Sequence, residues 1–130
     1  MAMIDHVTLY VRDLAKSRAF YAAALKPIGY APLYDYDESK TGGGKFVGIG
    51  AAPKAAFWLA ERKVPQTPFH IAFLAPNRAA VDAFYKAAMA AGAKDNGAPG
   101  LRPHYHKHYY GAFVFDLDGY NVEAVCHTPA

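Results

Sequence analysis

The stretch HVTLYVRDLAKSRAFYAAAL, residues 6–25, recurs later in the chain as HIAFLAPNRAAVDAFYKAAM, residues 70–89, and the two align without a gap. His6 falls on His70, and most aligned positions are identical or apolar in both copies. Self-similarity at a fixed offset is the mark of a duplicated structural unit. We therefore expect one domain, residues 1–130, that contains two similar modules at about 4–62 and 68–127.

Each copy predicts a strand followed by a helix. Alternating apolar residues at 4–11 and 69–75 indicate the strands. Apolar or small residues then recur at i, i+3, i+4, i+7 and i+8, which is typical of one buried helical stripe. The stripe comprises Ser17, Phe20, Tyr21, Ala24 and Leu25 in the first copy and Val81, Phe84, Tyr85, Ala88 and Met89 in the second. Asp13 and Asn77 are the expected N-caps, and Pro27 and Gly92 the expected stops.

Three further strands should complete each module. They are expected at 31–36, 45–50 and 55–60 in the first module, and at 109–115 and 121–126 in the second. A DLDG hairpin turn joins the last two. The segment DNGAPGLRP, residues 95–103, predicts an irregular loop in place of much of the remaining strand. The predicted fold class is α+β, with two tandem βαβββ modules.

The composition excludes several classes of protein. The formal net charge is only +3, from 14 basic and 11 acidic residues, so we expect no nucleic-acid partner. No segment approaches the roughly 20 continuous apolar residues of a membrane span, and we expect a soluble, cytoplasmic protein. The single cysteine, Cys126, excludes an internal disulfide, so any metal would be bound by nitrogen and oxygen atoms.

Strand alternation points to one candidate metal site. In three predicted strands every second residue is apolar and should face the helices, which directs His6, His70 and Glu123 to the opposite face. Since His6 and His70 are repeat equivalents, we expect them to meet near a pseudo-twofold axis together with Glu123. Two imidazoles and one carboxylate suit Fe, Mn, Ni, Co or Zn, and leave coordination positions open.

The repeat, the opening DHVTLYVRDLAKSRAFY and the closing FDLDGYNVEAV together resemble the vicinal oxygen chelate superfamily. This superfamily includes glyoxalase I, extradiol dioxygenases, fosfomycin-resistance transferases and bleomycin-resistance proteins. The resemblance implies that the sheets curl into a cup around a divalent metal, with His6, His70 and Glu123 as its ligands. It also implies a substrate whose neighbouring oxygens chelate the metal, which acts as a Lewis acid or activates dioxygen.

Three positions bear on which reaction the resemblance implies. Trp58 aligns with Glu123, where glyoxalase I has a glutamate that binds the metal and abstracts the substrate proton. Indole cannot do either, which favours the family members with three protein ligands. Thr8 matches a threonine that the fosfomycin-type enzymes use near their phosphonate, whereas Phe113 stands where those enzymes have a tyrosine.

The stretch RPHYHKHYYGAF, residues 102–113, places His104, His106 and His108 at alternate positions. It has no recognisable zinc spacing and no repeat partner, so we interpret it as a loop at the rim of the cup, with His104 and His106 in solvent. Substrate contacts are expected from Thr8, Trp58, Phe113 and Tyr110, and proton transfer from Tyr10, His108, Tyr109 or Tyr110. Which of Tyr109 and Tyr110 faces the cup depends on a strand phase that the sequence leaves open.

Two functions remain open at this point. The first is a metal-dependent lyase, isomerase, transferase or dioxygenase that acts on a small molecule with adjacent oxygens. The second is a metal-free protein that binds a small molecule or confers resistance to an antibiotic, using the same cavity lined by aromatic residues. The resemblance also implies a homodimer, because proteins with two such modules commonly pair or exchange them.

Overall fold

The computed structural model describes residues 4–37, 44–64 and 69–130, and these ranges form two four-stranded sheets. The first sheet, in the order β1-β4-β3-β2, contains β1 (Val7–Val11), β2 (Ala31–Tyr36), β3 (Phe46–Ala51) and β4 (Lys54–Glu61). The second, in the order β5-β8-β7-β6, contains β5 (His70–Leu74), β6 (Lys94–Leu101), β7 (Tyr110–Phe115) and β8 (Asn121–Cys126). β1 pairs with β4 in parallel, and β5 pairs with β8 in parallel. The other neighbouring strands in each sheet are antiparallel. The predicted βαβββ repeat is confirmed.

The two helices begin and end where the sequence predicts. In α1 (Leu14–Leu25) the Asp13 side chain accepts a hydrogen bond from the backbone N–H of Lys16, and in α3 (Arg78–Ala90) Asn77 accepts one from Ala80. A short 3₁₀ helix, η1 (Lys26–Ile28), follows α1 and contains the expected proline. These side-chain caps satisfy backbone donors that have no partner inside the helix.

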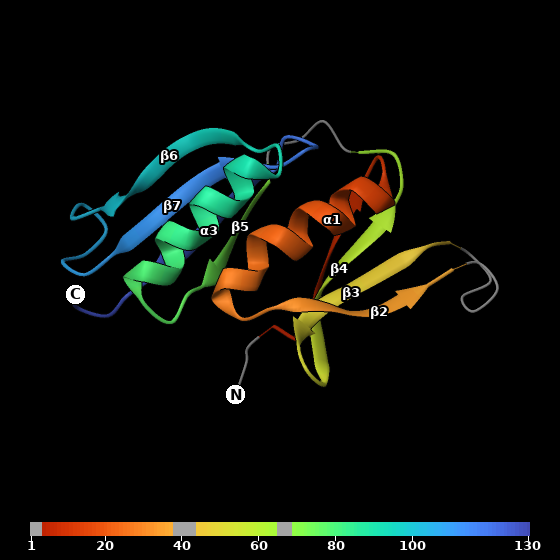
Figure 1. The fold of residues 1–130 in the computed structure, drawn as a ribbon, viewed down its shortest axis with the longest axis horizontal. Helices are drawn as coiled ribbons and strands as arrows, with labels where there is room; N and C mark the ends of the chain where they lie inside the picture. The colour runs from red at the N-terminus through yellow and green to blue at the C-terminus, as the bar shows by residue number, and fades with distance from the viewer. Residues whose placement is uncertain (1–3, 38–43, 65–68) are drawn as a thin grey trace.

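The helices lie side by side and share one core with both sheets (Figure 1). Phe20, Tyr21 and Phe84 of the predicted stripes are buried, as expected, whereas Tyr85 is only partly buried. Each sheet packs one face against its helix. The other face, which we call the open face, is turned away from both helices. None of the helices in the described part of the chain is long and apolar enough to cross a membrane.

The expectation of an irregular loop at residues 95–103 is wrong, because β6 spans Lys94–Leu101 as an edge strand. Its pairing with β7 shifts register between Asp95 and Gly97 and again between Gly97 and Gly100. An edge strand tolerates proline because one side of it needs no ladder hydrogen bonds. The glycine and proline content therefore marks an irregular strand at the edge of the sheet.

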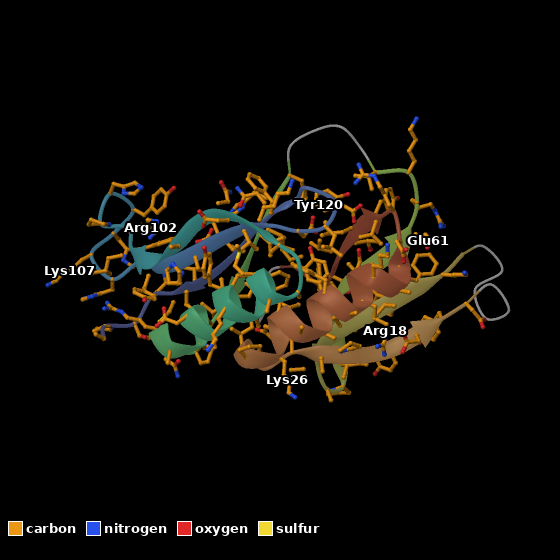
Figure 2. The ribbon with its side chains drawn as sticks, turned by 45° about the horizontal axis from the view of Figure 1, so that its top comes forward. Arg18, Lys26, Glu61, Arg102, Lys107 and Tyr120 are labelled. Atoms are coloured by element: carbon orange, nitrogen blue, oxygen red, sulfur yellow. The ribbon has the colours of Figure 1, made fainter. Side chains whose placement is uncertain are left out.

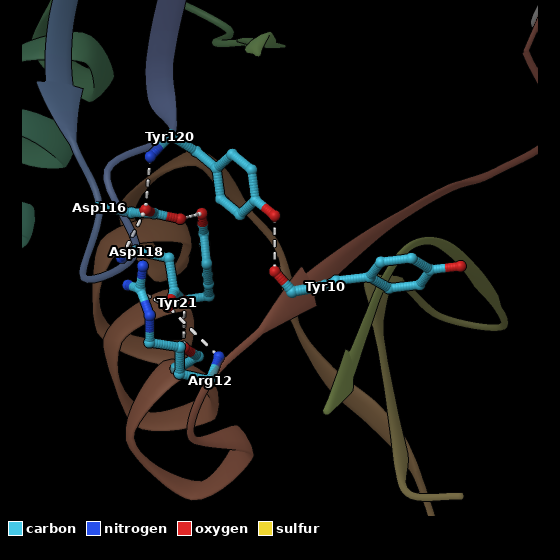
Figure 3. Close-up of polar contacts among 7 residues, drawn as sticks. Tyr10, Arg12, Tyr21, Asp116, Asp118 and Tyr120 are labelled. Atoms are coloured by element: carbon cyan, nitrogen blue, oxygen red, sulfur yellow. Dashed lines mark hydrogen bonds and ion pairs between the residues drawn. The ribbon is translucent and has the colours of Figure 1, made fainter. Parts of the chain in front are cut away.

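The hairpin turn at 116–119, between β7 and β8, joins the two modules through a buried carboxylate. Asp116 accepts hydrogen bonds from the backbone N–H groups of Asp118 and Tyr120 and from the hydroxyl of Tyr21 on α1 (Figure 3). Burial raises the pKa of the Asp116 carboxyl and, more strongly, that of the Tyr21 hydroxyl. The hydroxyl therefore remains protonated and continues to donate.

Two further contacts extend this junction to β1. Arg12 donates from its guanidinium to Asp118 over 3.1 Å, and the Tyr120 hydroxyl donates to the backbone oxygen of Tyr10 over 2.6 Å (Figure 3). The ring of Tyr120 also packs against Phe69, just before β5. The end of β1 is therefore fixed beside the start of β5.

Replacement of Tyr21 by Phe should remove one donor from Asp116 while preserving the packing. Since a hydrogen bond to a charged group contributes about 1.5–3 kcal/mol, we expect the free energy of unfolding to fall by about that amount in urea titrations. Tyr85, the repeat equivalent of Tyr21, donates to Asp95 at the protein surface and supplies a matched control. Tyr85→Phe should cost clearly less, and equal losses would contradict the role given to the junction.

Candidate functional site

A histidine and a buried glutamate form the centre of the candidate site on the open face of the second sheet. His70 Nε2 lies 3.0 Å from Glu123 Oε1, and the glutamate is only 1% exposed. Parallel pairing of β5 with β8 sets Ala72 opposite Glu123 and so places His70 within reach. The Nδ1 atom of His70 lies 3.1 Å from the backbone oxygen of Asn121, a contact that leaves Nε2 as the nitrogen directed at the carboxylate.

Tyr109 holds the second oxygen of Glu123. Its hydroxyl donates to Glu123 Oε2, and burial followed by this hydrogen bond raises the pKa of Tyr109 well above its ordinary value. The Tyr109 hydroxyl therefore stays protonated at neutral pH and acts as a hydrogen-bond donor to Glu123. A β-carbon at Gly111 would lie 3.1 Å from Glu123 Oε2, so glycine leaves the room that the carboxylate occupies.

Tyr110 lies on the opposite side of β7, which resolves the strand phase. Its hydroxyl donates to Asp82 on α3 over 2.6 Å, and the Arg78 guanidinium carbon lies 5.2 Å from the centre of its ring. Since successive strand residues point to opposite faces, only one of the two tyrosines can reach Glu123. Tyr110, which was expected to contact substrate, therefore faces the helix, and Tyr109 faces the site.

Phe113 lies beside His70 on the open face, and Arg102 lies beyond Phe113. The Phe113 ring lies 6.0 Å from the His70 ring at an interplanar angle of 25°, and Arg102 packs over Phe113 at 5.4 Å. Phe113 was expected on this face, but Arg102 was not. It lies within residues 95–103, a segment that we interpreted as a loop, so its strand phase could not be assigned from the sequence.

His6 does not join this group within one chain. It is exposed, and its Nδ1 atom lies 2.8 Å from Asp5 Oδ2. The described residues contain no cluster of three His, Cys, Asp or Glu side chains that could hold a metal ion. The expected meeting of His6 with His70 and Glu123 is therefore not formed by a single chain.

The directions of β1 and β5 explain this separation. A cavity of about 420 Å³ is lined by Ile4 and Val7, at the start of β1, and by Phe73 and Leu74, at the end of β5. The Tyr120 contacts fix the opposite end of β1 beside the start of β5. The two strands run past each other in opposite directions, so the repeat-equivalent histidines lie at opposite ends.

The open face of the first sheet is aromatic instead of ionisable. Pairing of β1 with β4 sets Thr8 opposite Trp58, just as Ala72 lies opposite Glu123, so the predicted equivalence of Trp58 and Glu123 is confirmed. The indole crosses Gly48, where a β-carbon would lie 2.7 Å from the ring.

Two tyrosines complete an aromatic group with Trp58. The rings of Tyr34, Tyr36 and Trp58, which we call the aromatic triad, are parallel to within 9–14°. All three centroid distances are 6.0–6.3 Å, so the ring centres form a triangle instead of a single column. Tyr10 is 46% exposed on the same face of the sheet.

The histidine-rich loop lies outside the His70–Glu123 group. His104 and His106 are exposed, as expected, and His106 Nε2 lies 2.8 Å from His127 Nδ1. His106 Nδ1 accepts a hydrogen bond from the backbone N–H of half-buried His108. Within this stretch, Tyr109 is the residue whose side chain hydrogen-bonds to Glu123.

Comparison with known proteins gives a consistent assignment of the fold. A family model described as the Glyoxalase/Bleomycin resistance protein/Dioxygenase superfamily matches residues 3–124. A search of curated protein sequences found no match. One similar structure is a glyoxalase/bleomycin resistance protein from Albidiferax ferrireducens T118, with 23% identity over 98% of this chain and 100% of that one, and a TM-score of 0.78.

Two further solved structures carry more specific names. A glutamate-to-glutamine variant of the fosfomycin resistance protein FosX from Listeria monocytogenes, with Mn(II) and 1S,2S-dihydroxypropylphosphonic acid, shares 22% identity over 98% of this chain and 92% of its own, with a TM-score of 0.71. A variant of glyoxalase I from Zea mays with the same type of substitution shares 21% identity over 94% of this chain and 46% of its own, also with a TM-score of 0.71. At these identities the likeness concerns the fold alone.

Replacement of Tyr109 by Phe should leave one oxygen of the buried Glu123 carboxylate without its donor. An unsatisfied buried group costs about 1–3 kcal/mol, so we expect a loss of that size in the free energy of unfolding, measured in urea without added metal. Tyr110→Phe is the control, because that hydroxyl bonds to Asp82 on the other face. A larger loss for the control would contradict the assigned strand phase.

Proposed function

Because the chain belongs to the glyoxalase/bleomycin resistance protein/dioxygenase superfamily, we propose that it is a divalent-metal enzyme that acts on a small molecule with two neighbouring oxygens. The observation that carries this proposal is the His70–Glu123 pair, an imidazole nitrogen and a buried carboxylate oxygen directed at each other over 3.0 Å. An imidazole nitrogen and a carboxylate oxygen are ligands that suit a divalent metal ion, and His70 and Glu123 would hold it. When bound, the metal supplies Lewis-acid chemistry to the substrate oxygens.

The surroundings of the pair also fit this use. Ligating histidines usually donate their other ring nitrogen to a carbonyl or carboxylate, as His70 Nδ1 can do to Asn121. Tyr109 holds Glu123 Oε2, so Glu123 Oε1 is the oxygen left to face a metal. The donor set suits Fe, Mn, Ni, Co or Zn, and the FosX structure with Mn(II) supports a divalent ion.

We propose that the third ligand, His6, comes from a second copy of the chain. Within one chain the open faces are turned outwards, and they expose apolar side chains that a partner would cover. Tyr10 is 46% exposed and Leu74 61%. In the proposed homodimer, the open face of one chain's first sheet covers the open face of the other chain's second sheet. This arrangement would bring His6 and the aromatic triad of one chain to the His70–Glu123 pair of its partner.

The residues present favour some reactions over others. Trp58 occupies the position equivalent to Glu123, so no carboxylate there can abstract a substrate proton. Tyr109 is a hydrogen-bond donor to Glu123, and Tyr10 and His108 remain candidates for proton transfer. A transferase or dioxygenase reaction, in which both substrate oxygens occupy open metal positions, fits this set better than a glyoxalase I reaction.

The aromatic triad favours a second candidate function. Three near-parallel aromatic rings, with Tyr34 and Tyr36 more than a third exposed, are a group against which a planar compound could stack. A protein that binds or sequesters such a compound would need no metal. This candidate uses Tyr34, Tyr36 and Trp58 and makes no use of Glu123.

Metal binding separates the two candidates. We expect the protein, purified without an affinity tag and titrated with Zn(II) or Mn(II) in a calorimeter, to bind close to one equivalent per chain. Glu123→Gln and His70→Ala should abolish tight binding, because each removes a ligand. His104→Ala, which alters an exposed histidine outside the site, is the control and should bind normally.

Failure of wild-type protein to take up any of the five candidate metals would contradict the enzyme proposal and favour the metal-free function. The assigned site would be contradicted if Glu123→Gln still bound the metal as tightly as wild-type protein. It would also be contradicted if His104→Ala lost metal binding.

The proposed dimer is tested by light scattering at tens of micromolar protein. We expect the mass of two chains, because the exposed apolar side chains on both open faces favour burial. Leu74→Glu places a charge on this surface without altering the core and should shift the population towards monomer. A wild-type monomer at this concentration would contradict the dimer.

A further inference from the structure

Arg102 lies on the same open face as the His70–Glu123 pair. Its backbone N–H donates to the backbone oxygen of Tyr109 over 2.8 Å, which sets the two residues opposite each other at the end of the β6–β7 ladder. Residues that lie opposite each other in a ladder point to the same face of the sheet. Because Tyr109 reaches Glu123, Arg102 also faces the site.

The guanidinium of Arg102 is held in one position. Its two terminal nitrogens donate to the backbone oxygens of Gly100 and Ala98, each over 2.9 Å, and its carbon lies 5.4 Å from the Phe113 ring centre. A β-carbon at Gly97 or Gly100 would lie 3.1–3.2 Å from those nitrogens. The glycines of β6 therefore make room for the guanidinium, which is ordered before any ligand binds.

The positive charge of Arg102 is not matched by a carboxylate. Within the part of the chain that the structure describes, no Asp or Glu lies at ion-pair distance from Arg102, whereas Arg12 and Arg18 pair with Asp118 and Asp35. The partners of Arg102 are neutral carbonyls. A guanidinium has five N–H donors in a planar fork, so donors remain for a carboxylate or a phosphonate.

The distance from Arg102 to the metal pair suits a small molecule. Phe113 lies beside both, 6.0 Å from the His70 ring and 5.4 Å from the Arg102 guanidinium. Glu123 on β8 is two strands away from the end of β6, about 10 Å at the usual interstrand spacing. Between them, Gly100 and Gly111 pair across β6 and β7, and the absence of their side chains leaves room for the Arg102 guanidinium over Gly100 and for the Tyr109 ring and Glu123 carboxylate over Gly111.

We propose that Arg102 binds an anionic group of the substrate, which makes the substrate a small acid. Two neighbouring oxygens of the substrate would occupy the metal at His70 and Glu123, and its carboxylate or phosphonate would pair with Arg102 across Phe113. This inference rests on the proposed metal function and adds the class of substrate to it.

The test compares two acidic chelators with a neutral one on zinc-loaded protein, since Zn(II) does not oxidise any of the three compounds. The probes are 3,4-dihydroxybenzoate, (3,4-dihydroxyphenyl)phosphonate and 4-methylcatechol, measured by calorimetry. Wild-type protein should bind at least one of the two acids about 10-fold more tightly than 4-methylcatechol, because a charge-assisted hydrogen bond contributes about 1.5–3 kcal/mol. Comparison of the two acids identifies which anion the fork prefers.

Arg102→Gln should abolish the preference for the acid and leave the affinities for 4-methylcatechol and Zn(II) unchanged. Arg102→Lys keeps the charge without the planar guanidinium and should give an intermediate preference for the acid. This variant replaces Arg102→Gln in the test if the Gln variant does not fold. Lys107→Gln removes the same charge from the neighbouring loop and should change nothing (Figure 2).

Two results would overturn this inference alone, with zinc binding intact. One is a wild-type protein that does not prefer either acid, and the other is an Arg102→Gln variant that keeps the preference or weakens all three probes equally. If wild-type protein does not bind zinc at all, the proposed metal function and this inference are both overturned.

Discussion

The buried carboxylate of Asp116 determines how the two modules are arranged. It lies in the turn between β7 and β8, accepts two backbone hydrogen bonds within that turn and accepts a third from Tyr21 on α1. A buried carboxylate is costly unless it is fully hydrogen-bonded, so the turn and the helix depend on each other. Together with the contact from Tyr120 to β1, this junction fixes the modules with their helices side by side and their open faces outwards.

The outward open faces explain why one chain contains only part of the proposed site. His70 and Glu123 meet because β5 and β8 pair in one sheet, whereas His6 lies beside another sheet, just before a strand that runs in the opposite direction. The open face of the second sheet carries the His70–Glu123 pair, and the open face of the first sheet carries His6 and the aromatic triad. A second copy of the chain is the simplest source of the missing half.

Much of this arrangement could be predicted from the sequence, because it depends on local rules. The repeat, the helix caps at Asp13 and Asn77 and the alternation that directs His70 and Glu123 to one face all follow from spacing. What could not be predicted depends on contacts distant in sequence. The bulged edge strand β6 is specified by its pairing with β7, and the orientations of Arg102 and Tyr109 follow from that register. The separation of His6 from His70 follows from the junction at Asp116.

A mixed dimer tests most directly whether the site is shared between two chains. Chains with His6→Ala and chains with Glu123→Gln each lack one ligand, so neither homodimer should bind zinc tightly. If the ligands come from different chains, the mixed dimer, isolated with two different tags that are then removed, regains one intact site and should bind one zinc ion per dimer. A mixed dimer that binds no zinc, while the wild-type protein does, would contradict a shared site.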